Sequence, residues 1–260
     1  MSLIDTARAA IRQARGRLHP NRMVFHHVPK CGGTSVGRAI RKRFLLSQAT
    51  VLAEATYRTE ALLDSAADPL TVLRRAEALR ERIFLYHMAA GVDCVSAHVR
   101  FSDTGHAAYH DVAKFVTILR DPVGRFISHY RWSHGRAHGH AHIAADFDSF
   151  LDSAEARHLG AFYVYFFSGL DPSADMTSQD ALDRAKANLD KFDVVGFLDR
   201  LPAFEAAIRE TVGVRVRIGH HNKARTEAPP ALHDAATQAK IEALTAPDRA
   251  FFAHALDTRR

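Results

Sequence analysis

The sequence predicts an α/β protein, a single domain with a central parallel β-sheet flanked by helices. Short apolar segments of strand length alternate with longer segments of helical periodicity. Strands separated by helical crossovers form parallel sheets that are covered on both faces. The chain has 260 residues, 47% of them hydrophobic, which is ample for a sizeable core. We therefore expect one domain over residues 1–260, with residues 1–20 as an N-terminal helical extension.

The first elements are a strand, a helix and a long helical region. Arg22–Val28 is expected to be a buried strand, and Ser35–Leu46 the helix that follows, because apolar residues recur there at helical spacing. Residues from about Ala49 to Ala90 also have a helical pattern. Within them, Asp68-Pro69 supplies a capping carboxylate and a first-turn proline, which predicts that a helix restarts there.

The remaining elements alternate in the same way. They are the strand "VDCVSAHV", the strand "AKFVTIL", a helix starting at Asp121-Pro122, a helical region from about Phe147 to Lys191, the strands "FDVVGFL" and "VRVRIG", and a final helix holding Phe251 and Phe252. In parallel sheets the ligand binds beyond the carboxyl ends of the strands. The loops that follow predicted strands are therefore expected to share one rim: Pro29–Ser35, His98–Gly105, Arg120–Pro122 and Gly219–Arg225.

Composition narrows the partners and the compartment. The formal net charge of +6 and a sequence pI near 9.5 favour an anionic partner: nucleic acid, an acidic membrane surface or a multiply charged small anion. A protein with mostly solvated arginines fits the charge too. The two cysteines, Cys31 and Cys94, form no disulfide framework and no Cys-x-x-Cys metal motif. With no apolar run of signal-peptide or membrane-spanning length, we expect a cytoplasmic protein.

The loop "PKCGGTS" has the composition of a phosphate-binding loop. Gly32 and Gly33 allow close backbone approach and positive φ, and Thr34 or Ser35 can cap the next helix, whose free amides favour an anion. Lys30 adds a mobile positive charge, although it precedes the glycines rather than following them as in the nucleotide-binding P-loop. A plain glycine-rich turn is the alternative.

Cys31 raises the question of the Cys-x5-Arg loop of tyrosine phosphatases. The arginine that such a loop needs is absent, because Gly37 occupies its position and Arg38 lies one residue too far. Cys31 is instead expected to fill a small space beside the loop.

The stretch "HHVPKCGGTS" resembles the 5′-phosphosulfate loop of sulfotransferases that use 3′-phosphoadenosine 5′-phosphosulfate (PAPS). The likeness is greatest to the carbohydrate branch, which includes the heparan 2-O-sulfotransferase relatives. The resemblance implies a fold like that of P-loop nucleotide kinases and a PAPS site over Lys30, Cys31, Gly32, Gly33, Thr34 and Ser35. It also implies that Lys30 contacts the bridging and terminal oxygens and that no metal is required.

The stretch "FVTILRDPVGRFISHYRW" supplies a second motif. Arg120 follows a strand and Ser128 lies slightly more than two helical turns later, so both can face one ligand. A guanidinium pairs with phosphate bidentately, and a hydroxyl adds orientation. In the resembled family, an arginine and a serine at this spacing bind the 3′-phosphate. A capped helix with Arg120 in a surface salt bridge is the alternative. Arg125 serves either acceptor binding or a structural ion pair.

Histidine suits the general base that an acceptor hydroxyl needs, because its pKa lies near neutrality. His98 ends a predicted strand on the rim of Lys30, and the resemblance implies that it is this base. Arg100, His106 and His110 are secondary candidates for acceptor binding or proton transfer.

Two other polar segments carry weaker signals. In "HHNKAR", Lys223 or Arg225 can help to close over the nucleotide, where cytosolic sulfotransferases have an Arg-Lys-Gly element. The run "HGRAHGHAH" places His138 and His142 four residues apart, a possible metal pair. The flanking glycines and the missing further ligands favour a polar loop beside the acceptor groove.

The function predicted first is transfer of a sulfuryl group from PAPS to a hydroxyl, with a glycan as acceptor, no nucleic acid as partner and no membrane span. An atypical P-loop kinase would bind magnesium-ATP instead, and a nucleic-acid-binding protein would bind with steep salt dependence. A relative that binds the nucleotide without catalysing transfer also fits these motifs. The sequence leaves the oligomeric state and the identity of the acceptor open.

Overall fold

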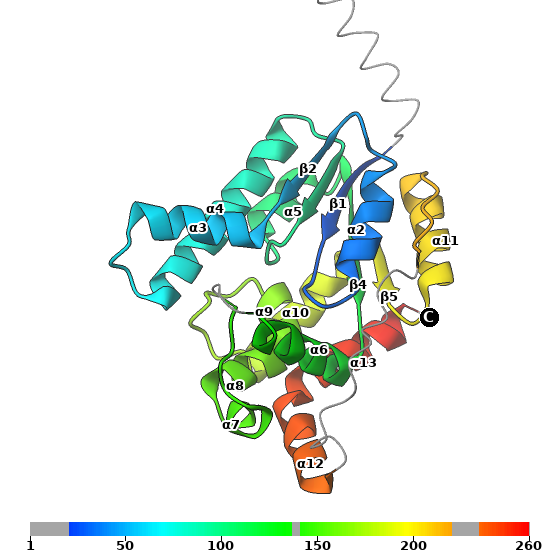
Figure 1. The fold of residues 1–260 in the computed structure, drawn as a ribbon. Helices are drawn as coiled ribbons and strands as arrows, with labels where there is room; N and C mark the ends of the chain where they lie inside the picture. The colour runs from blue at the N-terminus through cyan, green and yellow to red at the C-terminus, as the bar shows by residue number, and fades with distance from the viewer. Residues whose placement is uncertain (1–20, 137–140, 220–233, 260) are drawn as a thin grey trace, which may run out of the picture.

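The computed structural model describes residues 21–136, 141–219 and 234–259 (Figure 1). Its centre is a five-stranded, all-parallel sheet in the order β2-β3-β1-β4-β5. The strands are β1 (Arg22–His26), β2 (Gln48–Val51), β3 (Cys94–Ala97), β4 (Ala113–Leu119) and β5 (Val194–Phe197). The predicted α/β fold with a parallel sheet flanked by helices is confirmed. The predicted extension over residues 1–20 lies outside the described residues.

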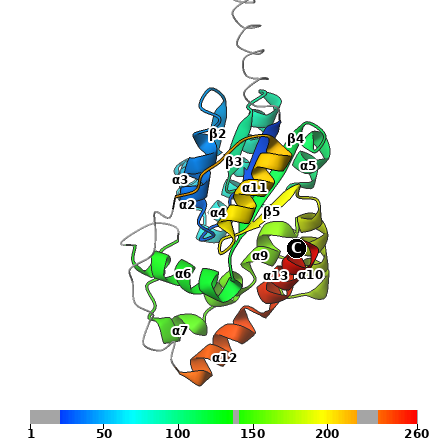
Figure 2. The same cartoon turned by 90° about the vertical axis from the view of Figure 1, so that its right-hand side faces the viewer.

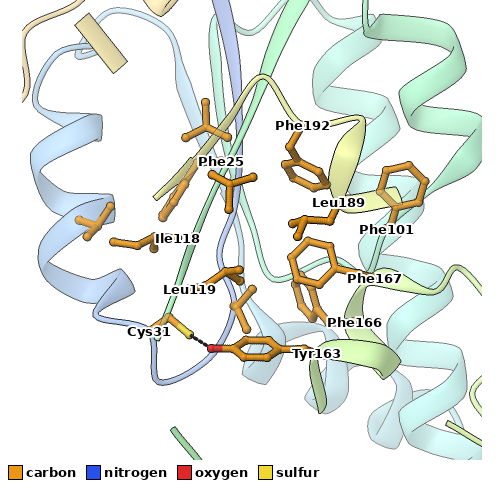
Figure 3. Packing of buried hydrophobic residues seen from close by; sticks show 14 of the residues in the cluster. Phe25, Cys31, Phe101, Ile118, Leu119, Tyr163, Phe166, Phe167, Leu189 and Phe192 are labelled. Atoms are coloured by element: carbon orange, nitrogen blue, oxygen red, sulfur yellow. Dashed lines mark hydrogen bonds between the residues drawn. The ribbon is translucent and has the colours of Figure 1, made fainter. Parts of the chain in front are cut away.

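Helices cover both faces of this sheet and close its carboxyl edge. They are α2 (Gly33–Arg41), α3 (Ala53–Leu63), α4 (Pro69–Ala89), α5 (Asp103–Tyr109), α6 (Pro122–His134), α7 (Phe147–Leu151), α8 (Ala154–Gly160), α9 (Phe162–Phe167), α10 (Gln179–Asp190), α11 (Leu201–Val212), α12 (Ala235–Leu244) and α13 (Ala246–Thr258). Helices α2 and α11 lie on one face, and α4, α5 and α10 on the other (Figures 1 and 3). Helices α6, α9 and α13 lie beyond the carboxyl ends of the strands (Figures 1 and 2).

One helix prediction and one strand prediction are wrong, for different reasons. β2 lies inside the stretch predicted to be helical from about Ala49, because this four-residue edge strand is too short for a periodic signal and forms by pairing with β3. Conversely, "VRVRIG" is not a strand. Val214, Val216 and Ile218 are buried in alternation, but the segment is irregular and the Ile218 amide donates to the Glu205 carboxylate. The alternating apolar residues arise because one side of this segment is buried, and the segment does not pair with a neighbouring strand.

The helix boundaries also differ from the prediction. The first helix spans Gly33–Arg41 rather than Ser35–Leu46, and the region from Phe147 to Lys191 divides into α7, α8, α9 and α10. The predicted start at Asp68-Pro69 is confirmed, since Asp68 accepts hydrogen bonds from two amides of the first turn of α4. Asp121 likewise caps α6 through the amide of Gly124.

An aromatic cluster fills the space between the sheet and α9 and α10. Phe101, Phe166, Phe167 and Phe192 pack there, together with Tyr163 near the carboxyl ends of the strands (Figure 3). This core holds α9 in place and positions the segments that follow β1 and β4. No helix in the described parts of the chain is both long enough and apolar enough to cross a membrane.

Candidate active site

The segment between β1 and α2 has the backbone of a ligand-binding turn. Lys30 and Gly32 both adopt left-handed conformations, with φ of 68° and 74°, and Gly32 is the N-cap of α2. For a residue with a side chain, such as Lys30, this conformation is strained, and strain of this kind clusters at functional sites. Thr34 is exposed and Ser35 half-buried in the first turn of α2. The free amides of that turn form a site suited to an anion.

Gly33 is needed at its position because the ring of His27 lies directly against it. A Cβ atom built on Gly33 would fall 1.4 Å from Nε2 of His27. Any larger residue would therefore displace this imidazole. The close approach links the loop to the histidine pair described below.

Lys30 and Arg120 lie together on the rim. Arg120 follows β4, and its Nη1 is 3.4 Å from the carbonyl oxygen of Lys30, to which it donates. Burial and the nearby Arg120 charge lower the pKa of Lys30 below its usual value. Among the described residues, no carboxylate forms an ion pair with either cation. Two neighbouring cations without a counter-charge favour the binding of an anion.

Ser128 and Trp132 extend this rim along α6. They lie one turn apart on the helix, so they share a face. Ser128 is half-buried. Nζ of Lys30 lies 5.1 Å from the centre of the Trp132 ring, whose surface is 41% exposed. Arg136 lies against the same ring at 4.4 Å. The indole therefore borders the position of the loop lysine while one part of it faces solvent.

His98 follows β3 and lies on the same side of the molecule as the loop. Its ring centre is 4.0 Å from that of His27, the ring that contacts Gly33. Burial, with a smaller contribution from the Arg80 charge, lowers the pKa of His98 to about 4. The imidazole is consequently neutral at pH 7 and can accept a proton.

The structure thus brings together most of the predicted site residues. The loop residues Lys30 to Ser35 follow β1, His98 follows β3 and Arg120 follows β4, whereas Ser128 lies on α6, the next helix. Lys223 and Arg225 lie outside the described residues, as do His138 and His140. Within the described residues no group of three or more potential ligands could hold a metal ion.

Three predicted acceptor-binding residues have other surroundings. Arg125 is fully buried and its Nη2 lies 3.5 Å from Asp248. Of the two predicted roles, acceptor binding or a structural ion pair, the structure therefore shows the ion pair. Arg100 donates to the carbonyls of Tyr165 and Leu170 and lies 3.7 Å from Glu77, so its guanidinium is engaged by the protein. His106 packs against Phe115 and lies 3.3 Å from the Lys191 carbonyl, toward the amino ends of the strands and away from Lys30.

Cys31 points inward and not toward a ligand. It is fully buried, and its sulfur lies 3.3 Å from the hydroxyl of Tyr163. Burial raises the pKa of this thiol to about 11, so the thiol stays protonated at neutral pH. This agrees with the expectation that Cys31 fills a small space beside the loop, and any contact with a nucleotide would come from its backbone.

Sequence reasoning missed three residues of this region: His27, Trp132 and Tyr163. His27 lies within the loop motif, and its position immediately before "VPK" was the available signal. Trp132 is the single tryptophan of the chain and lies one turn after Ser128. Tyr163 carried no local signal, because it comes from a distant helix in an aromatic run.

The fold is an α/β protein with a parallel sheet, and its site places two neighbouring cations, Lys30 and Arg120, beside the N-terminus of α2. A profile of the sulfotransferase family matches residues 18–238, and this chain belongs to that family. Transfer of a sulfuryl group is the general activity of the family, and PAPS is its usual donor. No curated protein matches the sequence.

Proposed function

We propose that this protein transfers the sulfuryl group of PAPS to a hydroxyl group of a carbohydrate. The observation that carries the proposal is that two cations, Lys30 and Arg120, lie close together beside the N-terminus of α2. Among the described residues, neither cation forms an ion pair with a carboxylate. A donor with phosphates at both the 5′ and 3′ positions supplies the missing negative charge at two points. The donor also supplies an activated sulfuryl group whose leaving group is adenosine 3′,5′-bisphosphate.

Each rim residue has a role in this proposal. The amides of α2 and the hydroxyls of Thr34 and Ser35 hold the 5′-phosphate, and Lys30 neutralises the charge that develops on it. Arg120 and Ser128 bind the 3′-phosphate through a charge-assisted fork and a hydroxyl. Lys223 or Arg225 would close over the nucleotide. Lys30 takes the charge-neutralising role that magnesium has in ATP enzymes, so no metal is required.

His98 acts as the general base. As the oxygen of the acceptor bonds to sulfur and the bond from sulfur to the 5′-phosphate breaks, the hydroxyl proton passes to the neutral imidazole. A free pKa of about 4 makes His98 a weak base. Bound phosphates nearby would raise the pKa, because negative charge stabilises the imidazolium. Activity is then lost as the pH falls through the pKa of His98 in the complex.

The partly exposed ring of Trp132 supports a ring-shaped acceptor such as a sugar. Aromatic rings present a flat apolar surface at binding sites, and this one lies next to the lysine of the loop. The sugar ring would lie on the indole with one hydroxyl directed to the sulfuryl group and to His98.

Calorimetric titration with adenosine 3′,5′-bisphosphate, ADP and magnesium-ATP tests the donor site. We expect micromolar binding of the bisphosphate alone. Arg120→Ala should weaken it by roughly 10- to 150-fold, because hydrogen bonds to charged groups contribute about 1.5–3 kcal/mol. Arg184→Ala, an exposed arginine paired with Asp180 on α10, removes the same charge away from the site and should leave the binding unchanged. Preference for magnesium-ATP would overturn the proposal.

Labelled donor then tests the acceptor and the base. Sulfate should appear on sugars and not on phenols, and His98→Gln should lower kcat by roughly 10²- to 10⁴-fold while leaving the affinity for the bisphosphate unchanged. Labelling of phenols alone would contradict the carbohydrate acceptor. Full activity of His98→Gln would remove the assigned base without affecting the donor site.

A further inference from the structure

One buried side chain, Tyr163, contacts both motifs that are proposed to bind the donor PAPS: the loop after β1 and the segment that begins at Arg120. This tyrosine comes from α9 and is fully buried beneath the rim (Figure 3). Its hydroxyl donates to the carbonyl of Arg120 at 2.6 Å and accepts from the amide of Arg120 at 2.9 Å. The sulfur of Cys31 in the phosphosulfate loop lies 3.3 Å from the same oxygen. One phenolic oxygen thus contacts both the loop after β1 and the first residue after β4.

The chemistry of the phenol makes this contact specific. A phenol has one proton, and here that proton is given to the Arg120 carbonyl. The thiol of Cys31 lies within reach of two acceptors, the phenolic oxygen at 3.3 Å and the Pro29 carbonyl at 3.8 Å. Burial raises the pKa of Tyr163 well above its ordinary value, so the phenol keeps its proton at neutral pH. Phenylalanine would keep the packing of the ring and lose all three contacts.

The helix that carries Tyr163 is itself anchored. The Asp248 carboxylate of α13 accepts from the amides of Tyr163 and Val164 at 2.8 and 3.2 Å. Arg125 of α6 lies against that carboxylate and donates to the carbonyl of Leu159, just before α9. Phe251 packs on the ring of Tyr163 with centres 5.5 Å apart. Helices α6, α9 and α13 therefore hold the hydroxyl at a fixed position.

We infer that Tyr163 is a positioning residue that sets the spacing between the 5′-phosphosulfate loop and the 3′-phosphate motif. It makes the site selective for a nucleotide phosphorylated at both positions. The inference rests on the proposed function. A ligand with both phosphates must satisfy Lys30 and Arg120 at the same time, so it benefits from a preset spacing. A ligand with the 5′-phosphate alone occupies one motif and does not depend on the distance to the other.

The test compares adenosine 3′,5′-bisphosphate with AMP on the full chain by calorimetric titration. In the wild type, we expect the bisphosphate to bind much more tightly than AMP. In Tyr163→Phe, the Kd of the bisphosphate should rise about five- to tenfold while the Kd of AMP changes less than twofold. The affinity ratio, defined as the Kd of AMP divided by the Kd of the bisphosphate, therefore falls. If the substitution only destabilised the fold, the binding of both ligands would weaken alike and the affinity ratio would not change.

Tyr165→Phe is the matched control. Tyr165 lies on the same helix and is also buried. The substitution removes a hydroxyl that donates to Glu77, which belongs to neither of the motifs proposed to bind PAPS. We expect a fall in melting temperature similar to that of Tyr163→Phe and an unchanged affinity ratio. If Tyr163→Phe does not fold, Cys31→Ala removes the loop side of the same contact and should lower the ratio in the same direction.

The outcomes separate the two hypotheses. A wild type that binds neither nucleotide, or binds them equally, refutes the proposed function and the inference with it. A wild type that prefers the bisphosphate, with the same ratio in Tyr163→Phe as in Tyr165→Phe, leaves the function standing and overturns the role of Tyr163.

Discussion

Two arginines of one motif, Arg120 and Arg125, face opposite environments. Arg120 lies on the rim beside Lys30, with no carboxylate paired to either cation among the described residues. Arg125, further along the same segment, is fully buried and paired with Asp248, and its guanidinium lies 4.9 Å from the centre of the Phe162 ring. The comparison shows that a cation without a counter-charge at the rim is a candidate for ligand binding, whereas a neutralised cation in the core holds helices together.

The largest expected effect is on the free energy of unfolding when the buried arginine, Arg125, is replaced. Burial raises the pKa of Asp248 to about 7, so the carboxyl group is mostly charged at pH 8. At that pH, Arg125→Ala removes one partner of a buried ion pair, which typically costs about 3–5 kcal/mol in the free energy of unfolding. Urea denaturation measures it. Arg120→Ala should change the same free energy by no more than about 0.5 kcal/mol, because its site is at the rim.

A double variant separates charge from packing in this prediction. Arg125→Met with Asp248→Asn removes both charges and keeps an oxygen that can accept from the amides of α9. We expect it to recover more than half of the loss. Equal destabilisation by Arg120→Ala and Arg125→Ala would contradict the division between rim and core.

The same division explains how much could be read from the sequence. The two motifs proposed to bind PAPS are local. In the first, strand, loop and helix follow one another over a short segment, so the amino-acid pattern alone places Lys30, Gly32 and Gly33 in one loop. The spacing of Arg120 and Ser128 allows both to face one ligand, and the resemblance to sulfotransferases implies that this ligand is the 3′-phosphate. The rim then follows from parallel strands ending on one side, which the alternating pattern predicted.

The parts that sequence reasoning could not supply all depend on contacts between distant segments. The ion pair of Arg125 joins residues far apart in the chain, and so does the hydrogen bond of Cys31 to Tyr163. The edge strand β2 exists only through pairing with β3. No local pattern encodes these partners, because tertiary packing selects them.

A second prediction concerns the buried histidines, because burial lowers the pKa of each of them. His26 is buried among aromatic rings, and this burial lowers its pKa from 6.5 to about 4. Between these values the unfolded chain takes up a proton at His26 that the folded protein does not, so the stability contributed by His26 is lost as the pH falls from about 6.5 to 4. Asp248 acts in the opposite direction between about pH 7 and 4, because burial raises its pKa to about 7. The slope contributed by His26 is at most about 1.4 kcal/mol per pH unit.

Urea denaturation at several pH values measures this slope. His27, His98 and His129 act in the same direction, because burial lowers the pKa of each. His26→Gln should therefore flatten the curve without abolishing its slope. A curve for His26→Gln that is parallel to that of the wild type would show that His26 takes no part in the acid response.

The smallest expected effect returns to the rim. Ser128→Ala removes a hydroxyl from the proposed 3′-phosphate site, and the loss of one such hydrogen bond should raise the Kd of adenosine 3′,5′-bisphosphate by roughly three- to tenfold, or about 1 kcal/mol. Ser133→Ala, a buried serine on the same helix, is the matched control and should not change the Kd. AMP should bind both variants as it binds the wild type. If Ser128→Ala instead weakened AMP and the bisphosphate equally, the serine would belong to the 5′ side of the site, and the 3′-phosphate would depend on Arg120 without it.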